Sequence, residues 1–177
     1  MSKALLLFIL CFIGTAWASN TPSTVSYVDL PRYMGKWYEI ARIPNTFQKS
    51  CVQDVSVSYQ LLPNNQVVGI NTCRKVNGEI FNLAVKGSAQ DKTNAKLVFN
   101  VTSTWLRWIP MLKADYWIVD LAKDYSHAAV ATADSQYLWL LSRQPKLDDG
   151  TYQLMLDRLA TRGFDVKKLV KNSNMGV

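Results

Sequence analysis

The feature that most constrains this chain is a series of eight strand-like segments joined by short connections. Apolar and polar residues alternate along many of them, as where Val55, Val57 and Tyr59 are separated by serines, and a period of two predicts half-buried strands. The expected strands are residues 35–43, 55–61, 66–74, 80–90, 97–102, 115–121, 128–132 and 137–143. Nearly every connection is short enough for a hairpin, so the sequence predicts an all-β, eight-stranded, up-and-down antiparallel barrel.

The pattern changes from strand to helix spacing after Pro145. Residues 148–149 offer capping acids, and apolar residues then recur at helical spacing until Gly163 ends the run. The sequence therefore predicts one C-terminal α-helix whose apolar stripe packs on the barrel wall. Residues 166–170 are expected to add a short strand, and residues 29–33 are expected to form a turn before the first strand.

The N-terminus has the pattern of a secretory signal peptide. Lys3 precedes a short apolar run, and small residues at 16 and 18 flank Trp17, so cleavage is expected after residue 18. Residues 19–177 then form a single domain, because no linker or repeat interrupts them. A lipid anchor is not expected, since bulky Leu10 precedes Cys11. These features predict a periplasmic or secreted protein, peripheral to an outer membrane at most.

Charge and composition narrow the classes of partner. The chain is 49% hydrophobic with a formal net charge of +7, which becomes +6 when Lys3 is removed with the signal peptide. Lysines and arginines are scattered rather than gathered in a run, which argues against a nucleic-acid groove and favours anionic ligands or membrane surfaces.

Two cysteines, Cys51 and Cys73, remain after cleavage. An even pair in an exported chain favours a disulfide over free thiols. A hairpin that turns at residues 64–65 places Cys51 opposite residue 78, so a bridge to Cys73 requires a bulge or a folded-back strand end.

The apolar parity of the strands predicts which side chains face the barrel interior. The residues expected to line a ligand cup are Val55, Val57, Tyr59, Phe81, Leu83, Phe99, Val101, Tyr116, Ile118 and Trp139. Leu61, Val85 and Leu97 share their parity, and about half of the set is expected only to fill a closed end. Glu39 shares the parity of Trp37, so it either pairs with an inward base or lies near the mouth in water.

The connection at residues 105–112 is unusually apolar for a loop and contains Trp105 and Trp108. Three partners fit such a surface: a ligand covered by the loop, a bilayer, or a second subunit in a homodimer. A loop folded onto its own barrel is the fourth possibility. The working hypothesis is a hydrophobic mouth for lipids in which both tryptophans bind ligand.

Catalysis is not expected from this sequence. His127 is the sole histidine, and the chain has no Gly-x-Ser-x-Gly elbow, no metal-spaced Cys/His set and no phosphate-binding glycine loop. No metal or cofactor is therefore expected. Two alternatives stay open: a haem or pigment scavenger with Tyr59, Tyr116 or His127 as ligand, and an interaction module acting through residues 105–112.

Three segments resemble the signatures of the lipocalin family. Residues 35–42 begin with Gly35-Lys36-Trp37, residues 115–119 begin with Asp115-Tyr116, and Arg143 ends the third segment. The wider match, over residues 27–170, is similar to bacterial lipocalins of the Blc type and to apolipoprotein D.

The resemblance implies a small extracytoplasmic carrier whose cup binds fatty acids, lysophospholipids or related apolar molecules. It also implies structural roles for the signature residues, with Arg143 packed on Trp37 at the closed end of the barrel. A guanidinium over an indole face is a favourable pair that seals a core. Blc-type members often carry an N-terminal lipid anchor, from which this sequence departs.

Overall fold

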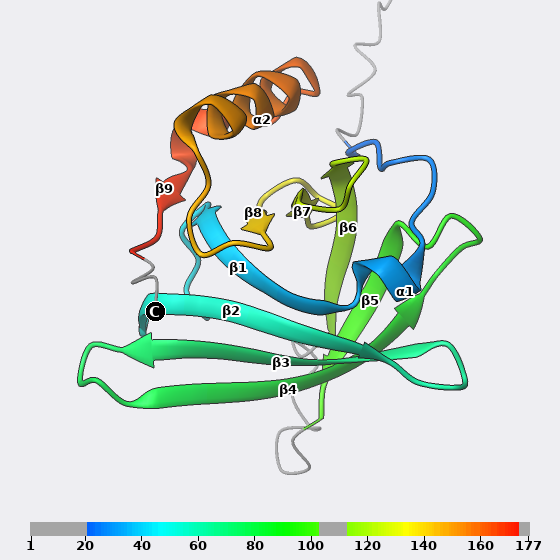
Figure 1. The fold of residues 1–177 in the computed structure, drawn as a ribbon, viewed down its shortest axis with the longest axis horizontal. Coiled ribbons are helices and arrows are strands. Elements are labelled where there is room, and N and C mark those ends of the chain that lie inside the picture. Colours follow the sequence, from blue (N-terminus) through cyan, green and yellow to red (C-terminus); the bar gives the residue numbers. More distant parts are fainter. Residues whose placement is uncertain (1–20, 103–112, 174–177) are drawn as a thin grey trace, which may run out of the picture.

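The computed structural model describes residues 21–102 and 113–173 and shows a closed antiparallel barrel with one long helix beside it (Figure 1). The barrel strands are β1 (Gly35–Arg42), β2 (Cys51–Leu61), β3 (Gln66–Lys75), β4 (Ile80–Ala89), β5 (Lys96–Val101), β6 (Lys113–Leu121), β7 (His127–Ala131) and β8 (Leu138–Ser142). Each strand pairs with the next, and β1 pairs with both β8 and β2. The predicted eight-stranded up-and-down barrel is confirmed.

The seam between β1 and β2 is closed in two parts. Gly35–Tyr38 pairs directly with Ser56–Tyr59, and beyond this stretch the two strands separate. The short strand β9 (Val170–Lys171) then pairs with the remaining edge of β1. Ser173 forms a bridge with Gln53 of β2, so the C-terminal segment fills the gap that the two strands leave.

One end of the barrel is sealed by side chains around Trp37. The short helix α1 (Leu30–Tyr33) lies across this end, and the carbonyl oxygen of Tyr33 accepts a hydrogen bond from Trp37 Nε1 at 2.8 Å. The guanidinium carbon of Arg143 lies 3.8 Å from the centroid of the Trp37 ring. Arg143 also donates to the carbonyl oxygens of Lys36, Arg32 and Tyr33, so one cation joins β8, β1 and α1.

The long helix α2 (Asp149–Thr161) packs on the outer wall, as predicted, and is drawn in orange in Figure 1. Its fully buried Met155 and Leu159 join outward-facing Leu138 and Leu140 of β8 in one apolar cluster. The alternate β8 residues face inward, because the side-chain period of a strand is two.

One local expectation is made more specific and another is corrected. The turn expected at residues 29–33 is the single helical turn of α1, because Asp29 caps the Arg32 amide and a proline occupies the start of the helix. Residues 166–170 are not one strand: Val166–Lys168 form the 3-10 helix η3, and β9 begins only at Val170, where the chain reaches the edge of β1.

The predicted disulfide between Cys51 and Cys73 is confirmed, with the Cα atoms 5.5 Å apart. The strand β2 contains two register shifts, before and after Gln53, which bring Cys51 opposite Lys75 rather than residue 78. Asp54 within this irregular stretch has a φ of 52°. The bulge that the bridge requires is therefore built into β2.

Two glycines make room for aromatic rings on the inner face of the sheet. A Cβ atom at Gly69 would lie 2.8 Å from the ring of Tyr59, and one at Gly87 would lie 2.8 Å from the ring of Phe99. The two rings stack at a centroid distance of 5.6 Å. These glycines are needed for space, and neither has a positive φ.

We predict that Gly87→Ala lowers the free energy of unfolding by about 2 kcal/mol or more, because the new methyl group also meets the Val98 backbone, which cannot turn aside. Urea unfolding would show a lower midpoint with an unchanged slope. Gly150→Ala in the first turn of α2 is the control and should not lower the midpoint, because alanine is the better helix former. Equal midpoints for Gly87→Ala and wild type would contradict this account of Gly87.

Candidate ligand-binding site in the barrel

The strand register sets which side chains face the interior. One row of inward-facing positions crosses β2 to β5 and contains Tyr59, Gly69, Val85 and Val101. The next row, farther from α1, includes Leu83. The carboxyl ends of β1, β3, β5 and β7 lie at the end of the barrel opposite α1, because consecutive strands run in opposite directions. That end is the mouth of the barrel.

The residues expected to line the cup fall into a buried group and a partly exposed group. Val57, Tyr59, Phe99 and Ile118 are buried in the core cluster that contains Trp37. Inward-facing residues that keep partial exposure are Leu83, Val101, Tyr116 and Trp139. The buried group packs beside Trp37, and the partly exposed group supplies inner surface that another molecule can contact.

Two of the expected residues lie outside both groups. Phe81, at the mouth end of β4, is 38% exposed and lies beneath the Lys75 ammonium, 5.0 Å from the ring centroid. Val55 packs against the disulfide in a small separate cluster. Trp105 and Trp108 lie outside the described residues.

The floor of the barrel, at the end that Trp37 seals, is an aromatic cluster. It includes one residue that the sequence reasoning missed. Tyr116 meets Phe99, Tyr59 and Tyr33 edge to face, at centroid distances of 5.4, 5.7 and 6.5 Å. Tyr33 belongs to α1, outside any strand, so parity could not place it. Its position four residues before Trp37, whose indole it binds, is the signal that could have found it.

Two of the three tyrosine hydroxyls of the floor bind each other. The hydroxyl oxygens of Tyr33 and Tyr116 are 2.9 Å apart, and the Tyr59 ring lies against the Tyr116 ring. Burial raises the pKa of all three phenols well above the usual value, because a phenolate would lose its hydration there. The three groups are therefore neutral over the whole physiological pH range.

At the mouth end, Glu39 is buried and paired rather than immersed in water. Its carboxylate accepts hydrogen bonds from Arg42 at 2.7 Å, Gln48 at 3.0 Å and Asn172 at 2.6 Å. The amide oxygen of Gln48 in turn accepts from the indole nitrogen of Trp139 at 2.9 Å. This network fastens the connection of residues 43–50 and the C-terminal segment to the inner face of the barrel.

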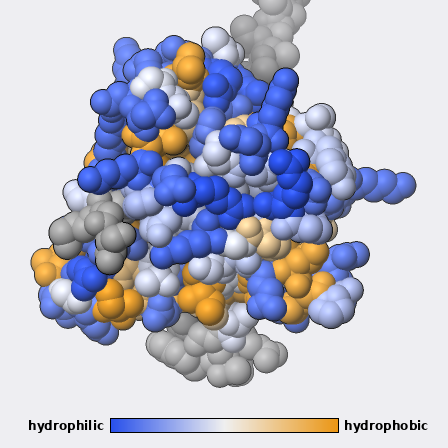
Figure 2. All heavy atoms as spheres, viewed as in Figure 1, coloured by the Kyte–Doolittle hydropathy of each residue, from blue (hydrophilic) through white to orange (hydrophobic). Residues whose placement is uncertain are grey.

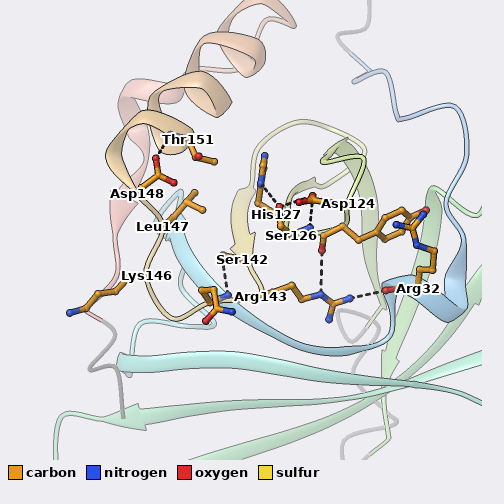
Figure 3. A pocket seen from close by; sticks show the side chains of 12 residues that line it. Arg32, Asp124, Ser126, His127, Ser142, Arg143, Lys146, Leu147, Asp148 and Thr151 are labelled. Atoms are coloured by element: carbon orange, nitrogen blue, oxygen red, sulfur yellow. Dashed lines mark hydrogen bonds between the residues drawn. The ribbon is translucent and has the colours of Figure 1, made fainter.

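A hollow of about 700 Å³ lies outside the barrel, between the start of β7, the end of β8 and the start of α2 (Figure 3). In it, Ser126 donates to Asp124 at 2.7 Å and contacts Nδ1 of His127 at 3.0 Å. His127 begins β7 and is partly buried. The carboxylate contacts the serine and not the histidine, so the trio lacks the order that activates a serine nucleophile.

Within residues 21–102 and 113–173, His, Cys, Asp and Glu side chains form no group of three that could hold a metal ion. In the same ranges, no helix combines the length and the apolar character that a membrane crossing needs.

A closed barrel with a sealed floor and a partly exposed inner wall defines a class of small binding proteins whose ligands enter at one end. Comparison with known families makes the class specific: residues 28–174 match the model of the Lipocalin-like domain. The chain belongs to the lipocalin family, whose members bind small hydrophobic ligands.

Relatives come from plants, bacteria and animals. Temperature-induced lipocalin-1 of Arabidopsis thaliana is 33% identical over 153 residues, covering 83% of this chain and 80% of the relative. Outer membrane lipoprotein Blc of Escherichia coli K12 is 31% identical over 165 residues, covering 90% of this chain and 89% of the relative. Apolipoprotein D of Mus musculus is 29% identical over 159 residues, covering 84% and 78%.

Solved structures agree on the fold. Lobster apocrustacyanin A1 superposes with a TM-score of 0.65 at 19% identity, covering 88% of this chain and 91% of the other. Insecticyanin of the tobacco hornworm Manduca sexta superposes with a TM-score of 0.65 at 19% identity, covering 86% of this chain and 83% of the other. The relatives are binding and transport proteins rather than enzymes.

The neutral floor predicts a specific loss of stability at alkaline pH. Above about pH 10 the unfolded chain releases protons from Tyr33, Tyr59 and Tyr116 while the folded chain retains them, so the free energy of unfolding falls as pH rises. The expected slope is about 1.4 kcal/mol per pH unit for each phenol. Urea unfolding between pH 9 and 12 measures it, with phenolate absorbance as a second signal.

Tyr116→Phe should reduce this slope by about one third, because one of the three phenols is then missing. Tyr27→Phe, at a side chain that is 59% exposed, is the control and should leave the slope unchanged. Phenolate absorbance from the floor that develops before unfolding would contradict the prediction.

Proposed function

We propose that this lipocalin carries fatty acids or lysophospholipids, with the acyl chain inside the barrel and the charged head group at the mouth. The observation that carries the proposal is a set of inward-facing side chains that keep accessible surface, in a barrel that Arg143 and Trp37 seal at one end. These side chains are Leu83, Val101, Tyr116 and Trp139. Apolar side chains that face inward and still retain accessible surface are the lining that a hydrophobic guest requires.

The energetics of an acyl chain support this assignment. Each buried methylene contributes about 0.8 kcal/mol, so a long chain gains roughly 10 kcal/mol before the entropy of association is subtracted. Micromolar or tighter binding follows without a directed charge contact. Exposed lysines at the mouth end, Lys49 and Lys113, favour an anionic head group, and this preference should weaken with salt.

We propose that the protein is extracytoplasmic, with a cleaved signal peptide at residues 1–18 and a single domain at residues 19–177. These two features support it together with the disulfide, which is typical of oxidising compartments. Four relatives named as outer membrane lipoprotein Blc add further support.

If the barrel carries a ligand, a large side chain added to its interior should weaken ligand binding. Leu83→Trp adds a ring to the inner face of β4 and should weaken binding of a fluorescent fatty acid by about tenfold or more, because the added volume displaces the guest. Ala84→Trp adds the same ring to the exposed outer face of the same strand and should leave the affinity unchanged. Fluorescence titration of both variants and of the wild type measures the difference.

Native mass spectrometry provides the independent measurement for this proposal. A fatty acid or lysophospholipid that co-purifies at about one molecule per chain would support it, and the same spectrum reports any homodimer. A wild-type barrel that holds no lipid and binds no fluorescent fatty acid would overturn it.

We further propose that the mouth rests on a membrane surface while the ligand is exchanged. Large apolar side chains are exposed around this end, including Phe47 at 64%, Val76 at 81%, and also Val52 and Ile80. Figure 2 shows apolar atoms at the lower left of the molecule, over the β3–β4 hairpin, beside hydrophilic ones. Apolar residues next to lysines suit the interface of an anionic bilayer.

This second role predicts that Phe47→Ser combined with Val76→Ser reduces binding to vesicles of phosphatidylcholine and phosphatidylglycerol, because less apolar surface enters the interface. Leu154→Ser, at an exposed leucine of α2 on the barrel's side, is the control and should bind as wild type does. Co-sedimentation at low and high salt measures it. Equal sedimentation of the double variant and the control would contradict membrane contact at these residues.

A further inference from the structure

One polar side chain on the inner face of the barrel, that of Asn71, forms no hydrogen bond within the part of the chain that the structure describes. Asn71 of β3 pairs directly with Val57 of β2 and with Leu83 of β4, so the three side chains share one face of the sheet. Val57 in turn pairs with Trp37 at the sealed end of the barrel. The Asn71 amide therefore lies in an otherwise apolar row that faces the interior.

The side chains beside Asn71 in this row offer nothing that its amide can bind. Those of Val57 and Leu83 have no polar atoms, whereas an amide carries two N–H donors and a carbonyl acceptor. Asn71 and Leu83 both keep part of their surface accessible, so a guest in the barrel can contact them. A plain alkyl chain that covered the amide would leave it buried without a partner, which is costly. The amide therefore favours a guest that brings a polar group to this position.

The position of Asn71 along β3 sets how deep that polar group lies. The strand ends at the mouth with Lys75, four residues after Asn71. A strand rises about 3.3 Å per residue, so the amide is roughly 13 Å along the strand from the mouth. A head group that stays at the mouth does not reach the amide. The partner of Asn71 is therefore a group within the chain of the ligand.

We propose that the Asn71 amide hydrogen-bonds an uncharged hydroxyl group within the acyl chain of the ligand, so that the barrel prefers hydroxylated fatty acids to plain ones. This inference rests on the proposed carriage of acyl ligands and makes their class more specific. A hydroxyl donates to Oδ1 or accepts from Nδ2, so it pairs with either end of the amide. A carboxylate at this depth would be desolvated beside Val57 and Leu83, which have no charge to pair with it.

The test compares fatty acids that differ only by a hydroxyl group in the chain, by displacement of a fluorescent fatty acid. Hexadecanoic acid and its 6-, 8-, 10-, 12- and 14-hydroxy derivatives share one head group, and the wild type should bind at least one hydroxy acid more tightly than the plain acid. Asn71→Leu should weaken binding of that hydroxy acid by about fivefold or more, because its hydroxyl loses its partner. The same variant should bind hexadecanoic acid at least as tightly as the wild type does, since an apolar chain then meets an apolar wall.

Two further variants separate the hydrogen bond from other effects. Asn71→Val also removes the amide but has a shorter side chain than leucine, so the same loss in this variant excludes crowding as the cause. Asn100→Leu makes the matched change on the exposed outer face of β5 and should alter neither affinity.

The inference is wrong if the wild type binds plain and hydroxylated acids equally well. It is also wrong if Asn71→Leu changes the binding of hexadecanoic acid and of every hydroxy acid by the same factor, or changes none of them. If the wild-type protein binds neither type of acid, the proposed function itself fails.

Discussion

The stacking of Arg143 on Trp37 is the contact on which the rest of this structure depends. One guanidinium covers the indole and donates to carbonyl oxygens of β1 and α1, so it fixes the start of the first strand against the end of the last. The barrel is thereby closed to solvent at one end. A sealed end is what turns a ring of strands into a cup with a floor, because a barrel open at both ends would not retain an apolar guest.

The two ends of the barrel use the same kinds of side chain in different ways. At the floor, rings of Tyr59 and Phe99 lie over Gly69 and Gly87 and leave little free space. At the mouth, a buried polar network centred on Glu39 fixes the loop after β1 without filling the interior. The floor therefore supplies rigidity, and the walls between the ends are left for binding.

The sequence predicted much of this architecture, for physical reasons that are easily stated. Period-two alternation and short connections predict hairpins, and a hydrophobic run at helical spacing predicts α2 on the wall. The irregular stretch around Asp54 escaped this reasoning, because a bulge breaks the period by which strands are recognised. Tyr33 escaped because it enters the core from a helical turn. Glu39 could be placed inside by parity, but its partners Gln48 and Asn172 come from a loop and a tail that have no period.

The position of β9 in the seam has a consequence for the order in which the molecule assembles. The first strand of the barrel is made early, yet part of its edge is paired by residues 170–171, which follow all eight barrel strands. During synthesis this edge stays unpaired until residues 170–171 have been made. Contacts between distant parts of a chain also form slowly, because a long loop has to close. An exposed strand edge invites pairing with other chains. A nascent barrel of this kind is thus most vulnerable to misassembly just before its last residues arrive.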